Sequence, residues 1–151
     1  MSEERPFEFG SEGPRVIVAG VDGSDTSMRA GAYAWGLARR NDSRLILVHV
    51  SPVAALSTLT PGGAAAMREA ADEIAQELRE ELERAARQGP AVRHELILER
   101  GDAATVLARV ADEARADMVV VGASAQAGHR LVGSVAVRLV RAGRWPVTVV
   151  P

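Results

Sequence analysis

The stretch MVVVGASAQAGHRLVGSVAV, residues 118–137, contains an apolar run, a loop of mostly small or polar residues, and a second apolar pattern that begins at Gly133-Ser134. A short apolar run bounded by turn residues is typical of a buried strand, and the later pattern predicts a short helix from about Ser134 to Arg141. The first N–H groups of that helix would have no partner within it and would favour an anion. The stretch therefore predicts a strand, a loop and a helix, in which the loop either binds a phosphate or only turns the chain.

The same unit of strand and helix recurs along the rest of the chain. The run RVIVAGV, residues 15–21, is followed by Asp22-Gly23-Ser24, and Ser24 is placed to cap a helix that continues to about Arg40. Further strands are expected at 44–50, 92–99 and 146–150, and further helices at about 64–88 and 103–115. Strands that alternate with helices imply right-handed crossovers and a parallel sheet covered on both faces. We therefore predict an α/β fold with three layers and a doubly wound, five-stranded parallel sheet of order 3-2-1-4-5.

Length and composition limit the classes of function. The chain has 151 residues, no cysteine and a formal charge of −2, so one domain is expected, without disulfides and without a general attraction for nucleic acid. No apolar run reaches about 18 residues, and the start has no apolar core of a secretion signal, so we expect no membrane contact and a cytoplasmic location. Residues 1–14 are interpreted as a flexible tail, and residues 15–151 as the folded domain.

Two turns are expected to form a ligand site. In an open parallel sheet, ligands bind beyond the carboxyl ends of the strands, at the point where the strand order reverses. Asp22 follows the first strand, and the loop from Gly122 to Ser134 follows the fourth, so both fall at this point. Asp22 can accept hydrogen bonds from a ribose or a base but would repel a phosphate. We therefore place the nucleoside at Asp22 and the phosphates at Gly133-Ser134, the alternative being that these residues only turn the chain and start helices.

The residues that would support catalysis are missing from these turns. The segment GHRLVGSV, residues 128–135, has the glycine spacing of a phosphate loop, but Ser134 stands where that loop needs a lysine and the chain has no lysine. His49 and His94 fall in expected strands and are interpreted as packed or surface residues. His129 and Arg130 either meet a phosphate or form an exposed loop tip. No nucleophile, base and acid can be grouped as a triad, so we predict no catalytic residue, no enzymatic activity and no metal site made by side chains.

Charged residues on two expected helices are interpreted as structural. On the helix at 64–88, pairs such as Glu80 with Arg84 would lie on a solvated face and contribute about 0.2–0.5 kcal/mol each. Arg138, Arg141 and Arg144 recur at helical spacing near the end of the chain, where positive charge offsets the helix dipole.

Four separated segments resemble the universal stress protein family. They are VIVAGVDGSDTSMRA for the first strand and turn, LILVHV for the second strand, ADMVVVGAS for the fourth, and LVGSVAVRLVRAGRWPVTVV for the last helix and strand. The resemblance covers about residues 15–150. It implies an adenine-nucleotide-binding α/β domain that takes part in stress response or signalling. It also implies a homodimer formed through the last strand, Val147 to Val150, whose apolar edge would otherwise be open to pairing.

The resemblance also implies a set of binding residues. Members that bind ATP carry Gly-x-x-Gly, nine residues, and then Gly-Ser or Gly-Thr. In this chain Gly122 and Gly133-Ser134 match, but Ala125 stands at the second glycine and the following segment is two residues shorter. The implied ligand is ATP or an adenine nucleotide with fewer phosphates, with Mg²⁺ as its accompanying ion. The nucleotide-binding residues are then Gly20, Val21, Asp22, Val50, Val121, Gly122, Ser124, Ala125, Gly133, Ser134 and Val135. The alternative function is a dimeric protein-interaction module whose cleft no longer binds a nucleotide.

Overall fold

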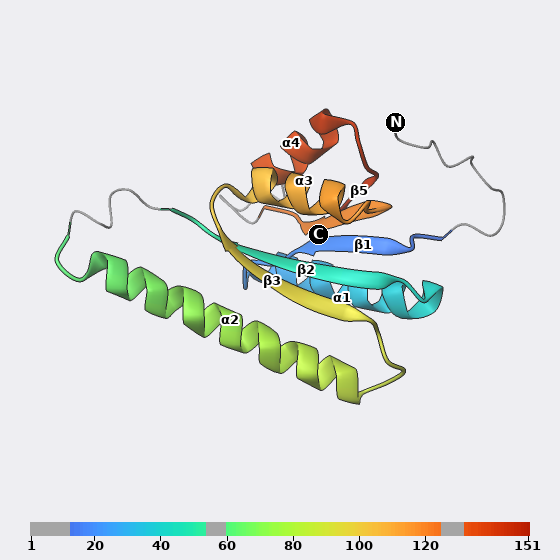
Figure 1. Cartoon of the computed structure of the whole chain (residues 1–151), viewed down its shortest axis with the longest axis horizontal. Helices are drawn as coiled ribbons and strands as arrows, with labels where there is room; N and C mark the ends of the chain where they lie inside the picture. The colour runs from blue at the N-terminus through green and yellow to red at the C-terminus, as the bar shows by residue number, and fades with distance from the viewer. Residues whose placement is uncertain (1–12, 54–59, 125–131) are drawn as a thin grey trace.

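The computed structural model describes residues 13–53, 60–124 and 132–151 (Figure 1). Within these residues the chain forms the strands and helices that its pattern predicts, with boundaries within about two residues of the expected ones. In chain order they are β1 (Val16–Gly20), α1 (Asp25–Asn41), β2 (Arg44–Ser51), α2 (Gly63–Arg87), β3 (His94–Arg100), α3 (Ala103–Glu113), β4 (Met118–Gly122), α4 (Ser134–Ala142) and β5 (Val147–Val150).

The strands form one parallel sheet with the order β3-β2-β1-β4-β5, which confirms the predicted α/β fold and strand order. The carboxyl ends of the strands are not level: β2 and β3 extend further than β1. The last residue pair between β1 and β2 is Gly20 with Val48, whereas the pairing of β2 with β3 continues to Ser51 and Arg100. This difference leaves a notch above the end of β1, beside the last residues of β2.

The sheet is buried on both faces. Helices α1 and α2 cover one face, and α3 and α4 cover the other (Figure 1). Because side chains alternate along a strand, Leu45 and Leu47 of β2 pack on the α1 side, and Ile46 and Val48 pack on the α3 side. A central strand of a doubly covered sheet therefore needs apolar residues at every position, which explains the continuous run in β2.

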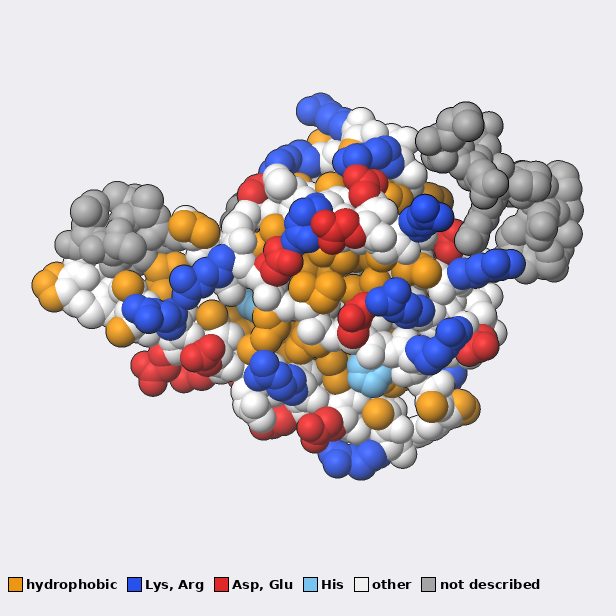
Figure 2. All heavy atoms as spheres, in the orientation of Figure 1, with side chains coloured by type: hydrophobic (Ala, Val, Ile, Leu, Met, Phe, Trp, Pro, Cys, Tyr) orange, Lys and Arg blue, Asp and Glu red, His pale blue; other side chains and the backbone are white. Residues whose placement is uncertain are grey.

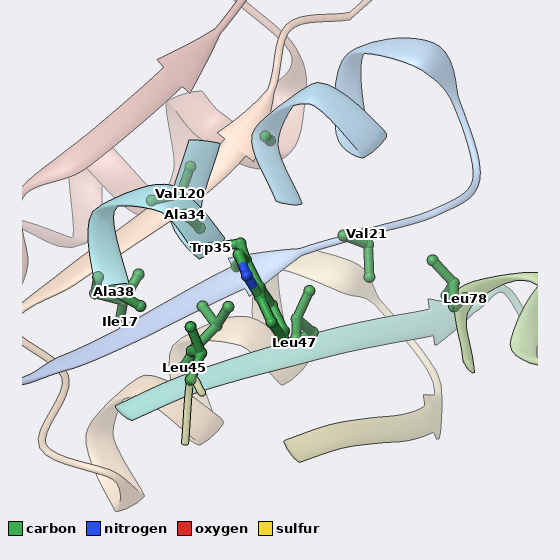
Figure 3. Packing of buried hydrophobic residues seen from close by; sticks show 12 residues of the cluster. Ile17, Val21, Ala34, Trp35, Ala38, Leu45, Leu47, Leu78 and Val120 are labelled. Carbon is green, nitrogen blue, oxygen red and sulfur yellow. The ribbon is translucent and has the colours of Figure 1, made fainter. Parts of the chain in front are cut away.

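Helices α1 and α2 are attached to the sheet through a few large side chains. Trp35 of α1 points toward Leu45 and Leu47, and Leu78 of α2 lies near Val21 at the end of β1 (Figure 3). Ser24 caps α1 by accepting a hydrogen bond from the backbone N–H of Ser27, as predicted. In α2 the buried residues are Ala75 and Leu78, so most of this long helix stays exposed to solvent.

Several charged residues in and next to α3 and α4 form ion pairs between elements, which the sequence pattern did not predict. Arg138 of α4 pairs with Asp102, the residue that caps α3, and Arg144 pairs with Asp112. Arg109 of α3 reaches Glu99 of β3. Figure 2 shows such oppositely charged side chains next to one another over α3, around hydrophobic side chains that gather between α3 and β3. The sequence pattern interprets Arg138 and Arg144 as offsetting the helix dipole, whereas in the structure both arginines form ion pairs with carboxylates near the two ends of α3.

The ion pair predicted between Glu80 and Arg84 is wrong, because Arg84 has a different partner. Arg84 pairs with Glu81, and Glu80 accepts a hydrogen bond from Gln76. Both arrangements join neighbours on an exposed helix surface, where several partners lie within reach of one arginine.

In the part of the chain that the structure describes, no helix combines the length and the apolar character that crossing a bilayer requires.

Candidate nucleotide site

The turn after β1 is held by its own polar side chains. The Ser24 N–H donates to Oδ1 of Asp22 over 2.9 Å, and the Asp22 N–H donates to Oγ of Ser27 over 3.0 Å. Gly23 between them has a φ of 83°, in the left-handed region that favours glycine. The local sequence Asp-Gly-Ser therefore fixes the direction in which the Asp22 carboxylate leaves the sheet.

Asp22 is held in its ionised form. Desolvation by the groups packed around the carboxylate raises its pKa. Hydrogen bonds from Ser24 and Ser27 lower the pKa by more, so the pKa of Asp22 lies below its ordinary value. At neutral pH the turn presents a fixed negative acceptor, which suits the hydroxyl groups of a sugar.

A cavity of about 390 Å³ lies in the notch beyond β1. The residues that line it come from the ends of the first three strands, from the residues that follow β1 and β2, and from the first half of α2. It brings Asp22 and Val50 together, two of the residues predicted to contact a nucleoside. The remaining lining residues are His49, Ser51, Pro52, Val53, Ala64, Met67, Arg68, Ala70, Ala71, Ile74 and Arg100.

The peptide groups of β2 alternate in the direction of their hydrogen bonds. Val48 accepts a bond from the Val21 N–H on the β1 side, while Ser51 accepts from the Gly101 N–H on the β3 side. By this alternation the N–H and C=O of Val50 point toward β1, above the level at which β1 has ended. Val50 therefore offers one donor and one acceptor to the notch.

His49 is a cavity residue that the sequence reasoning did not place in the site. Its place in a strand predicts a packed or surface residue, and its side chain is buried, with 4% exposed, against the end of β1. Nδ1 lies 2.8 Å from the carbonyl oxygen of Val21. Its position beside Val50, at the end of a strand and on the same face as Leu47, was the signal that could have placed it here.

The end of β4 packs directly against the start of α1. The Thr26 hydroxyl donates to the carbonyl oxygen of Ala123 over 2.6 Å. At Gly122 an added Cβ would lie 2.5 Å from the carbonyl carbon of Thr26 and 2.6 Å from the Ser27 nitrogen. These contacts place Gly122 and Ala123, at the end of β4, next to the turn after β1, as the predicted switch point requires.

The start of α4 lies beside Ser124. A Cβ added to Gly133 would be 3.2 Å from Cβ of Ser124. Gly133 is the N-cap residue of α4 and has no side chain to satisfy the first N–H groups, those of Ser134, Val135 and Ala136. Gly122, Ser124, Gly133 and the first turn of α4 thus form a second group at the same end of the sheet.

The two groups of predicted residues are neighbours but do not share one cavity. Among the described residues, those that line the 390 Å³ cavity include none from β4 or α4. Gly20 packs on the opposite face, where an added Cβ would be 3.0 Å from Leu107 and 3.5 Å from the side chain of Val121. Ala125, His129 and Arg130 lie outside the described residues, as do residues 1–12 of the predicted tail and most of the loop after β2.

Comparisons with known proteins agree with one another. A model of the universal stress protein family matches residues 14–151. A universal stress protein of Methanocaldococcus jannaschii is 30% identical over 139 residues, which are 90% of this chain and 81% of that protein. The solved structure of the universal stress protein UspA from Lactobacillus plantarum is 21% identical and superposes with a TM-score of 0.78, covering 90% of this chain and 97% of its own. A universal stress protein solved in complex with cAMP is 29% identical, with a TM-score of 0.65 and coverage of 92% and 98%.

Proposed function

The chain belongs to the universal stress protein family, and we propose that it binds an adenine nucleotide where β1, β2 and β4 end. In this proposal it acts in stress response or signalling by binding, without turning the nucleotide over. ATP and forms with fewer phosphates are the candidate ligands. A relative of 29% identity whose structure holds cAMP supports the nucleotide class.

The observation that carries the proposal is that Asp22 and Val50 line the same cavity, where a carboxylate and a peptide group are both available to a ligand. Adenine has an acceptor at N1 next to a donor at its N6 amino group, which matches the N–H and C=O of Val50. The Asp22 carboxylate can accept from the ribose hydroxyls, and its lowered pKa keeps it charged for this role. The cavity volume of about 390 Å³ lies within the usual range of small-molecule sites, roughly 300–1,000 Å³.

The phosphates would lie toward the first turn of α4. Its N–H groups and the positive end of the helix dipole favour an anion. Within the described residues, no group of three His, Cys, Asp or Glu side chains could hold a metal ion, so a Mg²⁺ ion would have to depend on phosphate oxygens. Because Ala125 and the shortened segment depart from the ATP-binding pattern, a nucleotide with fewer phosphates fits this loop as well as ATP.

The absence of turnover is supported by the chemistry of the side chains at the cavity. The chain has no lysine or cysteine at all, so two common nucleophiles and the usual phosphate-loop cation are missing. His49 contacts the Val21 carbonyl through Nδ1 and is buried, so it is poorly placed to activate a water. These features favour a protein that holds its ligand.

We expect adenine nucleotide to raise the melting temperature of the protein and Asp22→Ala to remove this rise. A ligand at 100 times its Kd stabilises a protein by about 2.7 kcal/mol, which corresponds to roughly 5–10 °C for a domain of this size. Thermal unfolding is measured with ATP, ADP and AMP at millimolar concentration. Asp22→Asn keeps an oxygen for the Ser24 N–H but loses the charge, so it separates the carboxylate's role in binding from its role in the turn.

Asp72→Ala is the matched control, because Asp72 is an exposed carboxylate of α2 that does not line the cavity. Its variant should respond to nucleotide as the original protein does. A melting curve that none of the three nucleotides changes would contradict the proposal. That result would favour the alternative, an interaction module whose cleft no longer binds.

We also propose that two copies associate through β5. All four residues of this strand are only half-buried at the edge of the sheet. The Val119 N–H donates to Pro146 and the Ala123 N–H to Val150, so the peptide groups of Val147 and Val149 point away from β4 by alternation. An apolar edge with free peptide groups is a template for pairing with another strand.

Val149→Pro should therefore turn a dimer into a monomer while the fold is kept. The substitution removes an outward N–H, and proline is tolerated on edge strands where that group faces away from the sheet. The molar mass is measured by light scattering after gel filtration, with circular dichroism to confirm folding. A Val149→Ala variant controls for the loss of the side chain, and a folded proline variant that remains dimeric would rule out this interface.

A further inference from the structure

We propose that His49 is a positioning residue of the base site, which keeps the peptide group of Val50 free for a ligand. The inference deepens the proposed nucleotide binding and rests on it. It assigns to His49 a role that neither its burial nor the family membership by itself supplies.

The hydrogen-bond ladder between β1 and β2 stops one step short at its upper end. In a parallel ladder, bonds from one residue go to positions before and after its partner. The Val21 N–H donates to the carbonyl oxygen of Val48 over 2.9 Å, so the next step would join the Val50 N–H to the carbonyl of Val21. That step is absent from the backbone hydrogen bonds of the described residues.

The imidazole of His49 takes the place of this step. Its Nδ1 lies 2.8 Å from the Val21 carbonyl oxygen. Since a carbonyl only accepts, Nδ1 must carry the proton and donate. The side chain of a β2 residue thus closes the end of β1, and the backbone of the following residue is left without the partner that the ladder would give it.

The environment of the ring fixes this arrangement. Nε2 is buried and has no hydrogen-bond partner among the described residues, so a proton on it would be a buried donor without an acceptor. Nδ1 is the ring nitrogen that has an acceptor, so its contact with the Val21 carbonyl oxygen fixes the orientation of the ring. Val21 is itself buried between α1, β2 and α2, which holds its carbonyl in place for the contact.

The consequence for binding concerns the donor of Val50. With His49 on the Val21 carbonyl, Val50 presents both its N–H and its C=O, and adenine needs both for N1 and the N6 amino group. Without the imidazole, the carbonyl of the buried Val21 loses its donor, which favours a hydrogen bond from the Val50 N–H and an extension of the ladder by one step. Only the C=O of Val50 would then remain for the base.

The first test needs no nucleotide. Hydrogen exchange of the Val50 amide is measured by NMR in the ligand-free protein and in His49→Leu, which replaces the imidazole by an apolar side chain of similar size. We expect the Val50 amide to exchange at least tenfold more slowly in His49→Leu, because the ladder closes. An unchanged or faster exchange rate in a folded variant would overturn the inference.

The second test uses AMP and its 1-deaza analogue, which lacks the N1 acceptor. Calorimetry should show about tenfold weaker binding of AMP to His49→Leu, the size expected for one lost hydrogen bond, and little change for the analogue. His49→Asn, whose amide nitrogen can donate from a position close to that of Nδ1, should restore most of the affinity for AMP.

The outcomes separate the two proposals. If the original protein binds neither AMP, ADP nor ATP, the proposed function fails, and the exchange measurement alone decides whether His49 frees the Val50 amide. Suppose that the original protein binds AMP. If His49→Leu then lowers the affinities for AMP and for the analogue equally, or lowers neither affinity, the positioning role is wrong while nucleotide binding stands.

Discussion

Replacing Gly122 by alanine is expected to destabilise the protein more than any other single methyl group added at this end of the sheet. The new Cβ would lie 2.5–2.7 Å from three backbone atoms of Thr26 and Ser27, where no side chain can rotate away. Overpacking of this kind costs about 1–3 kcal/mol, occasionally more. Relief requires α1 to move from β4, which would also disturb the hydrogen bond from Thr26 to Ala123. Urea unfolding and the melting temperature measure the loss.

Gly36→Ala is the matched control for this substitution. Gly36 lies inside α1, and an added Cβ would meet nothing within 4 Å. Alanine in a helix interior is favoured over glycine by roughly 0.5–1 kcal/mol, so this variant should be slightly more stable than the original protein. Equal stability of the Gly122 and Gly36 variants would show that β4 and α1 are not in the close contact described here.

Leu139→Ala is expected to have the other large effect. Leu139 is 1% exposed and is the one large side chain among the fully buried residues of α4. A buried Leu→Ala change costs about 2–5 kcal/mol, through the lost transfer free energy and the cavity left behind. Each kcal/mol corresponds to roughly 2–4 °C in a domain of this size. Because α4 presents the first turn proposed to face the phosphates, nucleotide binding should weaken in the same variant.

Val140→Ala, at the next residue of the same helix, is the control. It shows how much of the stability loss in Leu139→Ala comes from the buried side chain and how much from a change to alanine in this helix. Val140 is 57% exposed, and a surface substitution of this kind stays within about 0.5 kcal/mol of the original stability. Denaturant unfolding of both variants, with nucleotide titration of whichever remains folded, provides the comparison. A loss below about 1 kcal/mol for Leu139→Ala would contradict the tight attachment of α4 to the sheet.

The glycines at the site have packing roles that the sequence pattern does not reveal. The sequence places Gly122 and Gly133 in the loop after the fourth strand, and the resemblance assigns them to a ligand. In the structure Gly122 is required by the contact of β4 with α1, whatever the ligand. Gly133 has a φ of −65°, which any residue can adopt, so its backbone conformation does not require glycine. A side chain at this position would instead crowd Ser124.

The sequence by itself determined the elements, their alternation and the order of the strands. Apolar runs, helical periodicity and residues such as Ser24 act through neighbours a few positions away, so their effect can be recognised in the chain. The alternating pattern of β3 and the C-terminal position of β5 were enough to place both at the edges. The same local information placed Asp22 and Val50 at the ends of neighbouring strands.

Only the tertiary structure decided which groups meet at those ends. His49 contacts a carbonyl 28 positions away, Thr26 bonds to a residue 97 positions away, and Arg138 pairs across 36 positions with the cap of α3. Such contacts depend on where each strand stops relative to its neighbour and on how closely a helix approaches the sheet. Those offsets of one or two residues come from the packing of the whole core, and no local pattern specifies them.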